Sequence, residues 1–388
     1  MNKTLEDACH IRTGKLNANA AVEGGIYPFF TCAEYPDEID HYAFDDNVVL
    51  VAGNNASGNF HVNRYEGKFN AYQRTYILTA KAGYNIDFIY YALKLELKRL
   101  REKAQGSQTK FLTMPILTSI SLRNITYDEQ CDIANKLIVI DKKIKTNNQV
   151  NAELEAIAKT LYDYWFVQFD FSNAEGKPYK SSGGKMAYSE MLNREIPEEW
   201  NVKPLRDITS VSNDSIDPAK NSEMIFKLYS IPVFDVTSSY SIEKGISIGS
   251  NKFTVKELDL LVSKLNPWFN RVVYALDLQD QICSTEFVVW RCPNLAIKNF
   301  MYLIATSDQF IAHCTQSATG TSNSHKRVNP NVMMSFVQPF DQKIAEKFGE
   351  TIDPMIKTIM VNRQENLQLE KLRDWLLPML MNGQVTVS

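Results

Sequence analysis

The sequence has little of what marks a secreted, membrane-bound or metal-binding chain. Its 388 residues include 6 cysteines, which are scattered and form no Cys-x-x-Cys pair, so neither a disulfide framework nor a zinc site is expected. The longest apolar runs, such as residues 48–52, are far shorter than the roughly 20 residues of a membrane span. The first residues are polar and lack the apolar core of a signal peptide. We therefore expect a soluble, cytoplasmic protein.

An excess of positive charge is also lacking. The chain has 42 basic and 45 acidic residues, a net charge of −3, so no global field attracts a polyanion. Residues 1–125 and 201–338 each carry a net charge of +1, whereas the remaining segments are acidic. This weak asymmetry points towards a modular protein that binds polyanions and supplies little phosphate neutralisation of its own.

Motifs that would indicate a cofactor or a catalytic centre are missing. There is no Gly-rich phosphate-binding loop, no dinucleotide fingerprint, no His-Glu-x-x-His and no Gly-x-Ser-x-Gly motif. The Asn/Asp-Pro-Pro-aromatic tetrapeptide with which amino-methyltransferases hold a target amine is absent too, and residues 329–332 only approach it. We therefore predict no catalytic residue, metal or cofactor in this chain. A self-sufficient nuclease or methyltransferase that acts on nucleic acid stays an alternative.

What the sequence does contain is an internal repeat, at offsets between 200 and 215 residues. Four segments recur in the same order: 5–11 as 205–211, 106–107 as 320–321, 141–146 as 353–358, and 151–157 as 366–372. Matches that keep their order with a nearly constant offset indicate a degenerate tandem duplication.

Each half of the repeat begins with a module of mixed character and ends with a long helix. Runs rich in Val, Ile, Tyr and Phe predict strands at residues 47–52, 72–79, 271–276 and 285–291. Apolar periodicity predicts helices at 86–104 and 295–316. The fold class is therefore α+β, with two tandem modules that are separated by two long helices.

The two long helices carry heptad seams. In the first, apolar or Asn residues alternate at +4 and +3 spacing: Ile133, Leu137, Ile140, Ile144, Asn147, Asn151, Leu154, Ala158, Leu161 and Trp165. In the second, a polar centre at Asn362 and Asn366 lies between two apolar stretches: Ile344, Phe348, Ile352, Ile356 and Ile359 on one side, and Leu369, Leu372 and Leu376 on the other. The matching polar centres predict an antiparallel coiled coil around a pseudo-twofold axis, with a kink at Pro354. Independent helices, each docked on its own module, are the alternative.

These signals divide the chain into five segments. Two modules span residues 1–125 and 201–338, and long helices span 126–171 and 339–388. Residues 172–200 are rich in Gly, Ser, Pro and Lys and are predicted to form a linker.

Polar loops at equivalent places of the two modules are the best candidates for a binding surface. Residues 104–110 and 317–327 each follow a predicted helix and combine Gly, hydroxyls, amides and cations, which can contact phosphates and base edges. A solvated turn between a helix and a strand, without a binding role, could have the same composition and stays an alternative. The candidate DNA-binding residues are Asn54, Asn55, Arg64, Lys68, Gln73, Arg74, Gln105, Ser107, Lys110, Lys264, Asn266, Arg271, Thr321, Asn323, Ser324, His325, Lys326 and Arg327, with the stretch 284–286 as a further candidate.

Several stretches resemble one family. Residues 161–171, 176–186 and 194–200 are similar to the central conserved region and linker of the DNA-specificity subunits of type I restriction–modification systems. Residues 66–74, 263–267 and 283–287 resemble motifs of the target-recognition domains of those subunits. The resemblance covers essentially the whole chain.

The resemblance implies a division of labour. Each module would be a target-recognition domain that reads one half of a bipartite, asymmetric site on double-stranded DNA. The helices would form a spacer and a docking surface for two methyltransferase subunits, which hold S-adenosylmethionine, while a restriction subunit, where present, uses ATP and Mg²⁺. Residues assigned to the helix seam or to partner binding are Asn147, Asn151, Tyr162, Trp165, Phe166, Asn362, Asn366 and Trp375.

The charge and length of the segments fit this role. Because each module is only weakly basic, we expect the chain to bind DNA poorly without its methyltransferase partner. A helix of about 40 residues spans roughly 60 Å, enough to serve two major grooves about 34 Å apart. A scaffold whose tandem modules bind protein peptides instead of DNA stays a second alternative.

Overall fold

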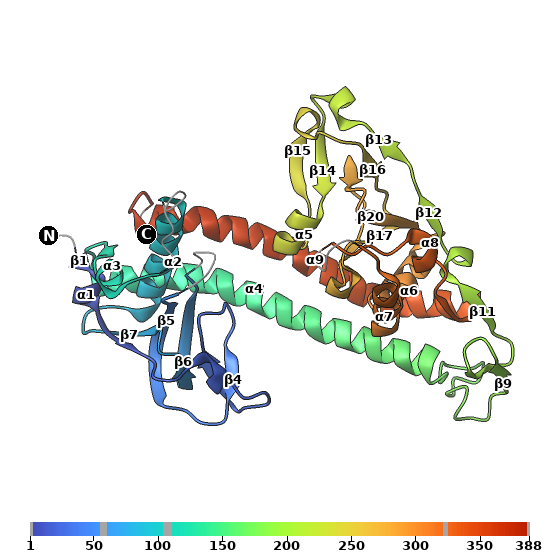
Figure 1. The fold of residues 1–388 in the computed structure, drawn as a ribbon, viewed down its shortest axis with the longest axis horizontal. Helices are drawn as coiled ribbons and strands as arrows, with labels where there is room; N and C mark the ends of the chain where they lie inside the picture. Colours follow the sequence, from blue (N-terminus) through green and yellow to red (C-terminus); the bar gives the residue numbers. More distant parts are fainter. Residues whose placement is uncertain (1–2, 55–59, 104–110, 321–324, 386–388) are drawn as a thin grey trace. The chain divides into compact units, whose positions relative to one another are not determined.

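The computed structural model describes residues 3–54, 60–103, 111–320 and 325–385, with the side chains of residues 100–103 left aside. The chain forms two compact units. The first unit contains residues 1–145 and 368–388, and the second contains residues 146–367. Helices α4 (Tyr127–Tyr162) and α9 (Gln342–Met381) contribute residues to both units (Figure 1). Among the described residues, no helix combines the length and apolar character of a membrane span.

The first unit is built on a six-stranded sheet. Its strand order is β2-β7-β5-β6-β3-β4. The bounds are β2 Cys9–Thr13, β3 Tyr27–Phe30, β4 Asp37–Ile39, β5 Phe44–Ala52, β6 Val62–Ala71 and β7 Thr75–Ala80. A two-stranded ladder joins β1 (Lys3–Thr4) to β8 (Ser121–Leu122), and the short helices are α1 (Leu5–Ala8), η1 (Ala18–Ala20) and α3 (Met114–Thr118).

Strand β5 lies at the centre of this sheet, and its residues 48–52 are buried on both faces. Alternate side chains of a strand point to opposite faces. Val49 and Val51 therefore join a core with helix α2 (Ile86–Lys103), whereas Val48 and Leu50 join a second cluster around Phe69. Figure 1 shows α2 beside β5, β6 and β7, and these elements are in contact. The Asn85 side chain caps α2 by accepting from the backbone N–H groups of residues 87 and 88, each at 2.9 Å.

The second unit contains two larger sheets. The four-stranded sheet has the order β12-β20-β17-β18 and the five-stranded sheet the order β13-β16-β19-β14-β15. The strand bounds are β12 Ser210–Ser212, β13 Ser215–Ile216, β14 Ile225–Tyr229, β15 Ser241–Lys244, β16 Lys252–Thr254, β17 Asp259–Ser263, β18 Val272–Tyr274, β19 Gln281–Cys283 and β20 Phe287–Arg291. Short ladders pair β9 (Met186–Ser189) with β10 (Arg194–Pro197) and β11 (Asn201–Pro204) with β21 (Val337–Phe340).

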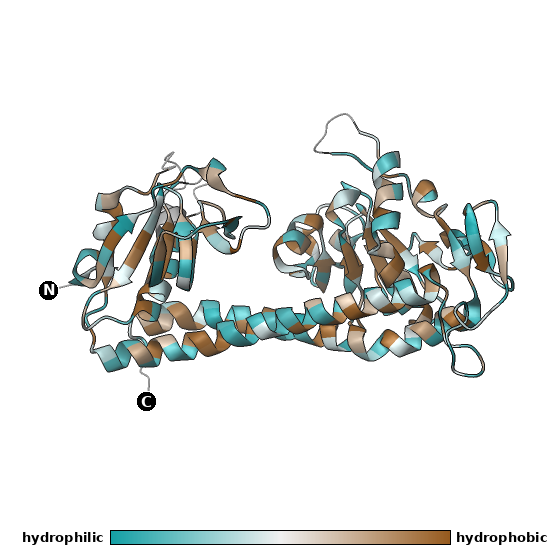
Figure 2. Cartoon of the chain, turned by 90° about the horizontal axis from the view of Figure 1, so that it is seen from below, coloured by the Kyte–Doolittle hydropathy of each residue, from teal (hydrophilic) through white to brown (hydrophobic). Residues whose placement is uncertain are grey.

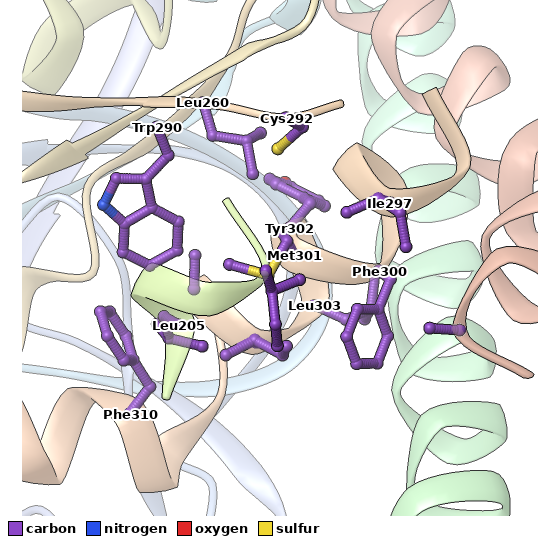
Figure 3. Packing of buried hydrophobic residues seen from close by; sticks show 14 of the residues in the cluster. Leu205, Leu260, Trp290, Cys292, Ile297, Phe300, Met301, Tyr302, Leu303 and Phe310 are labelled. Carbon is purple, nitrogen blue, oxygen red and sulfur yellow. The ribbon is translucent and has the colours of Figure 1, made fainter. Parts of the chain in front are cut away.

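Helices cover these sheets and complete the core of the second unit. They are η2 Asp163–Val167, η3 Leu205–Asp207, η4 Pro218–Asn221, α5 Ile231–Thr237, η5 Gly245–Ser247, η6 Pro267–Phe269, α6 Leu295–Ala305, α7 Asp308–Ser317 and α8 Pro330–Met333. Figure 3 shows part of the main core, to which Leu260 and Trp290 of the sheet and Phe300 and Phe310 of α6 and α7 belong. The ring centroids of Trp290 and Phe310 are 5.4 Å apart. Leu261 points to the other face of the sheet and joins a separate cluster.

The tandem repeat is visible in the topology of the two units. The order β2-β7-β5-β6 in the first matches β12-β20-β17-β18 in the second, and all of these pairs are antiparallel. Leu5 N donates to Ile120 O at 2.9 Å, and Leu205 N donates to Phe336 O at 3.0 Å. The same strand order and the same backbone bond at the start of each module support a duplication.

The predicted α+β class with two long helices is confirmed, but one predicted helix is wrong. The segment 295–316 forms two helices, α6 and α7, because the chain turns at residues 306–307. The Ser307 side chain accepts from Phe310 N at 3.3 Å and so caps the start of α7. Helix α9 spans Pro354 without a break, and the kink expected there stays a prediction.

The segment predicted as a linker is packed. Phe171 stacks between Tyr179 and Trp200, with ring centroids at 4.8 and 5.1 Å. Asp170 accepts from Ser181 N at 2.7 Å and from its hydroxyl at 2.6 Å. The Gly, Ser and Lys residues therefore form turns between aromatic anchors, and the proposed division into five functional segments stays a prediction.

In the second unit, α4 and α9 are joined through their asparagines. Asn147 Nδ2 donates to Asn366 Oδ1 at 2.9 Å, Asn366 Nδ2 donates to Asn148 Oδ1 at 2.8 Å, and Asn362 Nδ2 donates to Asn151 Oδ1 at 2.9 Å. Because residue numbers rise along α4 as they fall along α9, the helices are antiparallel. Figure 2 shows the hydrophilic central turns of both helices. Pairing through the predicted seam overturns the alternative of independent helices.

Aromatic residues of η2, directly after α4, belong to the core. Trp165 and Phe166 are buried, and both rings lie within 5.6 Å of the Phe348 ring of α9, measured between centroids. The half-buried Tyr162 ring stacks on Phe166 at 5.2 Å. Trp375, which we grouped with them, is 55% exposed, and Leu372 is exposed too. Leu377 and Leu380 occupy the buried side of that part of α9 instead.

The asparagine pairs generate a test of the seam. Asn366→Ala removes the acceptor of Asn147 Nδ2 and the donor to Asn148 Oδ1. We expect the free energy of unfolding to fall by about 1–3 kcal/mol as a result. The double variant Asn147→Leu/Asn366→Leu removes the polar groups together and should recover most of that loss. Urea denaturation of the full chain measures both, and a single variant as stable as the wild type would contradict the role of the network.

A buried lysine adds a pH-dependent term to the second unit. Lys298 of α6 donates from Nζ to Glu257 O and to Ala275 O, each at 2.5 Å, and Nζ lies 3.5 Å from the centroid of the Tyr274 ring. Burial lowers the pKa of Lys298 from its ordinary value of 10.5 to about 7. Between about pH 7 and pH 10, Lys298 is therefore mostly deprotonated in the folded chain and protonated in the unfolded chain.

Because the unfolded state binds more protons between about pH 7 and pH 10, the free energy of unfolding should rise with pH over that interval. Lys298→Met should remove this rise, whereas the exposed Lys220→Met should keep it. Chemical denaturation at a series of pH values makes the comparison. A pH dependence that is the same in all three proteins would show that Lys298 keeps an ordinary pKa.

Candidate nucleic-acid interface

The candidate residues of the first unit meet where β5 ends. We call residues 53–54, 72–74 and 111–112 the first cradle. Gly53 N donates to Arg74 O at 2.9 Å, and Leu112 N donates to Gly53 O at 3.0 Å. Asn54 forms an antiparallel bridge with Phe111. These backbone bonds join three segments that are remote in the sequence.

The first cradle presents polar side chains beside an exposed ring. Arg74 and Gln73 are exposed in the turn before β7, and Phe111 is 52% exposed. The Arg74 guanidinium lies over the Phe111 ring, 5.7 Å from its centroid. Gln73 Nε2 donates to Asn17 Oδ1 at 3.1 Å. In the part of the chain that the structure describes, no carboxylate pairs with Arg74.

The second unit repeats this arrangement at the end of β17. We call residues 264–266, 284–286 and 326–328 the second cradle. Lys264 N donates to Glu286 O at 3.0 Å, Val328 N donates to Lys264 O at 2.9 Å, and Leu265 forms an antiparallel bridge with Arg327. These are the same three links, in the same order, as in the first cradle.

The side chains of the second cradle differ from those of the first. Arg327 forms a bidentate ion pair with Glu286, from Nε at 2.9 Å and from Nη2 at 3.1 Å. These hydrogen bonds raise the pKa of Arg327. Lys264 and Lys326 are half-buried, and His325 is exposed. The second cradle therefore presents an ion pair, whereas the first presents a cation over an aromatic ring.

An exposed aromatic pair beside the second cradle was not predicted. Trp268 and Phe269 are 38% and 57% exposed. They lie in η6 between Asn266 and Asn270, which both have left-handed backbone angles (φ 48° and 47°). The Arg271 guanidinium lies over the Phe269 ring, 4.5 Å from its centroid. The sequence signal was the Asn-Pro-aromatic-aromatic-Asn pattern, which predicts a tight turn.

Three predicted DNA contacts are engaged inside the protein. Arg64 donates to Asp87 at 2.7 Å and also to the carbonyls of Val48 and Tyr65. The Arg271 side chain is 11% exposed and forms a bidentate pair with Asp235. Asn266 is buried, and its Oδ1 accepts from Lys326 N at 3.0 Å.

Direct contacts of Arg64 and Arg271 with DNA would require these ion pairs to open. Lys68 is exposed, but it lies over the Tyr42 ring, 4.7 Å from its centroid, and is not part of the first cradle. The remaining predicted residues lie outside the described residues: Asn55, Gln105, Ser107, Lys110, Thr321, Asn323 and Ser324.

The fold and the site define a class of protein, a duplicated α+β module with paired long helices and two related polar cradles. Comparisons with known proteins agree. The family model described as type I restriction modification DNA specificity domain matches residues 1–156 of this chain. The specificity subunit of the type I restriction enzyme EcoDI from Escherichia coli is 29% identical over 303 residues, which cover 73% of this chain and 66% of that subunit. The MjaIX specificity subunit from Methanocaldococcus jannaschii is 25% identical over 322 residues, 79% of this chain and 71% of the relative.

A solved structure has the same fold. The crystal structure of the S subunit of a type I restriction–modification system from M. genitalium superposes with a TM-score of 0.64 at 16% identity, covering 98% of this chain and 96% of that one. Along most of its length the chain is therefore similar to the specificity subunits of type I restriction–modification systems. The family resemblance inferred from the sequence is thereby confirmed, and the chain is similar to subunits that are named for specificity and not for catalysis.

Gly53 provides a test of the first cradle. A Cβ atom at this position would lie 2.5 Å from Arg74 O, so Gly53→Ala must displace the turn that carries Arg74. We expect a loss of stability of about 1–3 kcal/mol together with weaker site-specific DNA binding. Gly249→Ala is the matched control, because a Cβ there meets no atom within 4 Å. Thermal unfolding and DNA binding that are unchanged in Gly53→Ala would refute the proposed geometry.

Proposed function

We propose that this chain is the sequence-specific DNA-binding subunit of a type I restriction–modification complex. In this proposal residues 1–125 and 201–338 are two target-recognition domains, and each reads one half of a bipartite, asymmetric site. Partner subunits then methylate adenine and cleave DNA. The observation that carries the proposal is the pair of cradles, which share their backbone links but present different side chains.

The chemistry of the cradles suits base edges in the major groove. An arginine can donate two hydrogen bonds to guanine O6 and N7, and asparagine or glutamine can pair with adenine N6 and N7. The first cradle brings Arg74, Gln73 and Asn54 together, whereas the second brings Lys326, Arg327 and Glu286 together. Unlike side chains on like frames favour two different half-sites over a palindrome.

The long helices suit a spacer. Helix α4 has 36 residues and α9 has 40, so at 1.5 Å per residue they are about 54 and 60 Å long. Lengths of this order are sufficient to set the spacing between two half-sites about 34 Å apart. The hydrogen-bonded asparagines of the seam favour a single register of the two helices, which a spacer of fixed length requires.

The outer surfaces of the helices suit partner proteins. Several large apolar side chains on α4 and α9 are exposed: Val139, Val150, Ile157, Val361, Leu372 and Trp375. We propose that two methyltransferase subunits dock there and that restriction subunits join through them. S-adenosylmethionine, ATP and Mg²⁺ would be held by these partners. Since each module carries a net charge of only +1, the partners also supply most of the phosphate neutralisation.

A module exchange tests the proposal. Residues 1–125 are replaced by the corresponding residues of another specificity subunit, and the chain is purified with its methyltransferase partner. We expect the methylated adenines to map to a site in which one half is new and the other half is unchanged, because each module reads DNA separately. Exchange of residues 201–338 is the reciprocal control.

The alternatives predict other outcomes of the same experiment. An unchanged methylated site after exchange would remove the recognition role of the module. Methylation or cleavage by the purified chain alone would favour the self-sufficient enzyme. A complex with no DNA preference before or after exchange would favour a protein scaffold.

A further inference from the structure

We propose that residues 74 and 286, which occupy the same position in the two cradles, decide which base pair each half of the chain prefers. Position 74 would select guanine through an arginine, and position 286 would select cytosine through a carboxylate. The inference rests on the proposed function and names two residues as specificity determinants within it.

The equivalence of the two positions follows from the backbone. Arg74 O accepts from the first residue after β5, and Glu286 O accepts from the first residue after β17. Each residue immediately precedes the strand that pairs with that element, since Ala52 pairs with Thr75 and Ser263 pairs with Phe287. The facing residues also correspond, because Phe111 and Arg327 each form the bridge across their cradle.

In the first cradle the donor stands at the shared position. Arg74 is exposed, and its guanidinium lies over the Phe111 ring. Stacking on a ring fixes the plane of a guanidinium while its N–H groups stay available at the edge. This arrangement lowers the entropy lost on binding and matches the two acceptors of guanine.

In the second cradle the polarity is reversed. Glu286 places an acceptor at the shared position, and the cation stands on the facing residue, Arg327. The ion pair uses Nε and Nη2 of Arg327, and each carboxylate oxygen keeps a lone pair. Glutamate can accept from the N4 amino group of cytosine. The pair therefore holds a carboxylate in a fixed orientation toward a base that donates.

Arg74→Lys tests the first position with little change of charge. Lysine keeps the cation but loses the planar fork. The wild-type and variant chains, each with the methyltransferase partner, select from a pool of randomised DNA duplexes. We expect the preference for guanine at one base pair of one half-site to fall about tenfold, with the other half-site unchanged. Arg12→Lys is the matched control, because Arg12 also lies over a phenylalanine, Phe44, at 4.9 Å in the same unit but outside the cradle.

Glu286→Gln tests the second position in the same selection. We expect the cytosine preference at one base pair of the other half-site to weaken by a similar factor of about ten, and the first half-site to stay unchanged. Asp214→Asn is the matched control, because Asp214 pairs with Arg291 at the opposite end of strand β20 at 2.6 Å. Thermal unfolding of every variant confirms that it folds.

The outcomes separate the inference from the function on which it rests. A wild-type complex that selects no sequence would overturn the proposed function. A selective wild type with unaltered preferences in both variants would overturn the inference alone. A uniform loss of affinity for all duplexes would also overturn the inference. Such a result would indicate that the two residues contact phosphates or only stabilise the fold.

Discussion

Two backbone hydrogen bonds at Gly53 hold the first cradle together, one donated to Arg74 O and one accepted from Leu112 N. They close the end of a central strand whose last five residues, 48–52, are buried, so the residues around them cannot shift without disturbing the core. The corresponding bonds at Lys264 do the same in the second unit. The candidate interface depends on this constraint, because it fixes where exposed side chains stand without dictating which side chains they are.

Because backbone groups hold each cradle together, the side chains of the two cradles can diverge in sequence. Peptide N–H and C=O groups are the same in every residue, so a duplicated chain can keep the links while the side chains change. Gly53 and Lys264 occupy the same place with very different side chains. The first leaves no room for a Cβ beside Arg74 O, whereas the second carries a half-buried lysine. The two units can therefore share a topology and still present different side chains.

In helices α4 and α9, by contrast, the side chains determine how the two elements pair. Buried amides must find partners, because an unsatisfied polar group in a core costs about 1–3 kcal/mol. Asn147 with Asn366 and Asn151 with Asn362 meet that requirement in an antiparallel arrangement. A slip by one turn would leave these groups without acceptors. A polar centre in an apolar seam thus gives up stability for a defined register.

The sequence by itself determined the features that are local or periodic. Heptad spacing revealed both long helices and their asparagine centres, alternating β-branched runs revealed strands such as β5, and recurring segments revealed the duplication. The sequence also named Gln73, Arg74 and Arg327 as candidates, because turn chemistry and loop composition can be read directly. These signals are carried by neighbouring residues, so no tertiary information was needed.

Only the tertiary structure decided which polar residues stand free and which are engaged. Arg64 and Arg74 look alike in the sequence, yet Arg64 is held by Asp87 while Arg74 stacks on Phe111. The exposure of Trp375 was likewise decided by helix packing. Ion pairs, ring contacts and exposure depend on residues that are distant along the chain, and a pattern of neighbours contains no information about them.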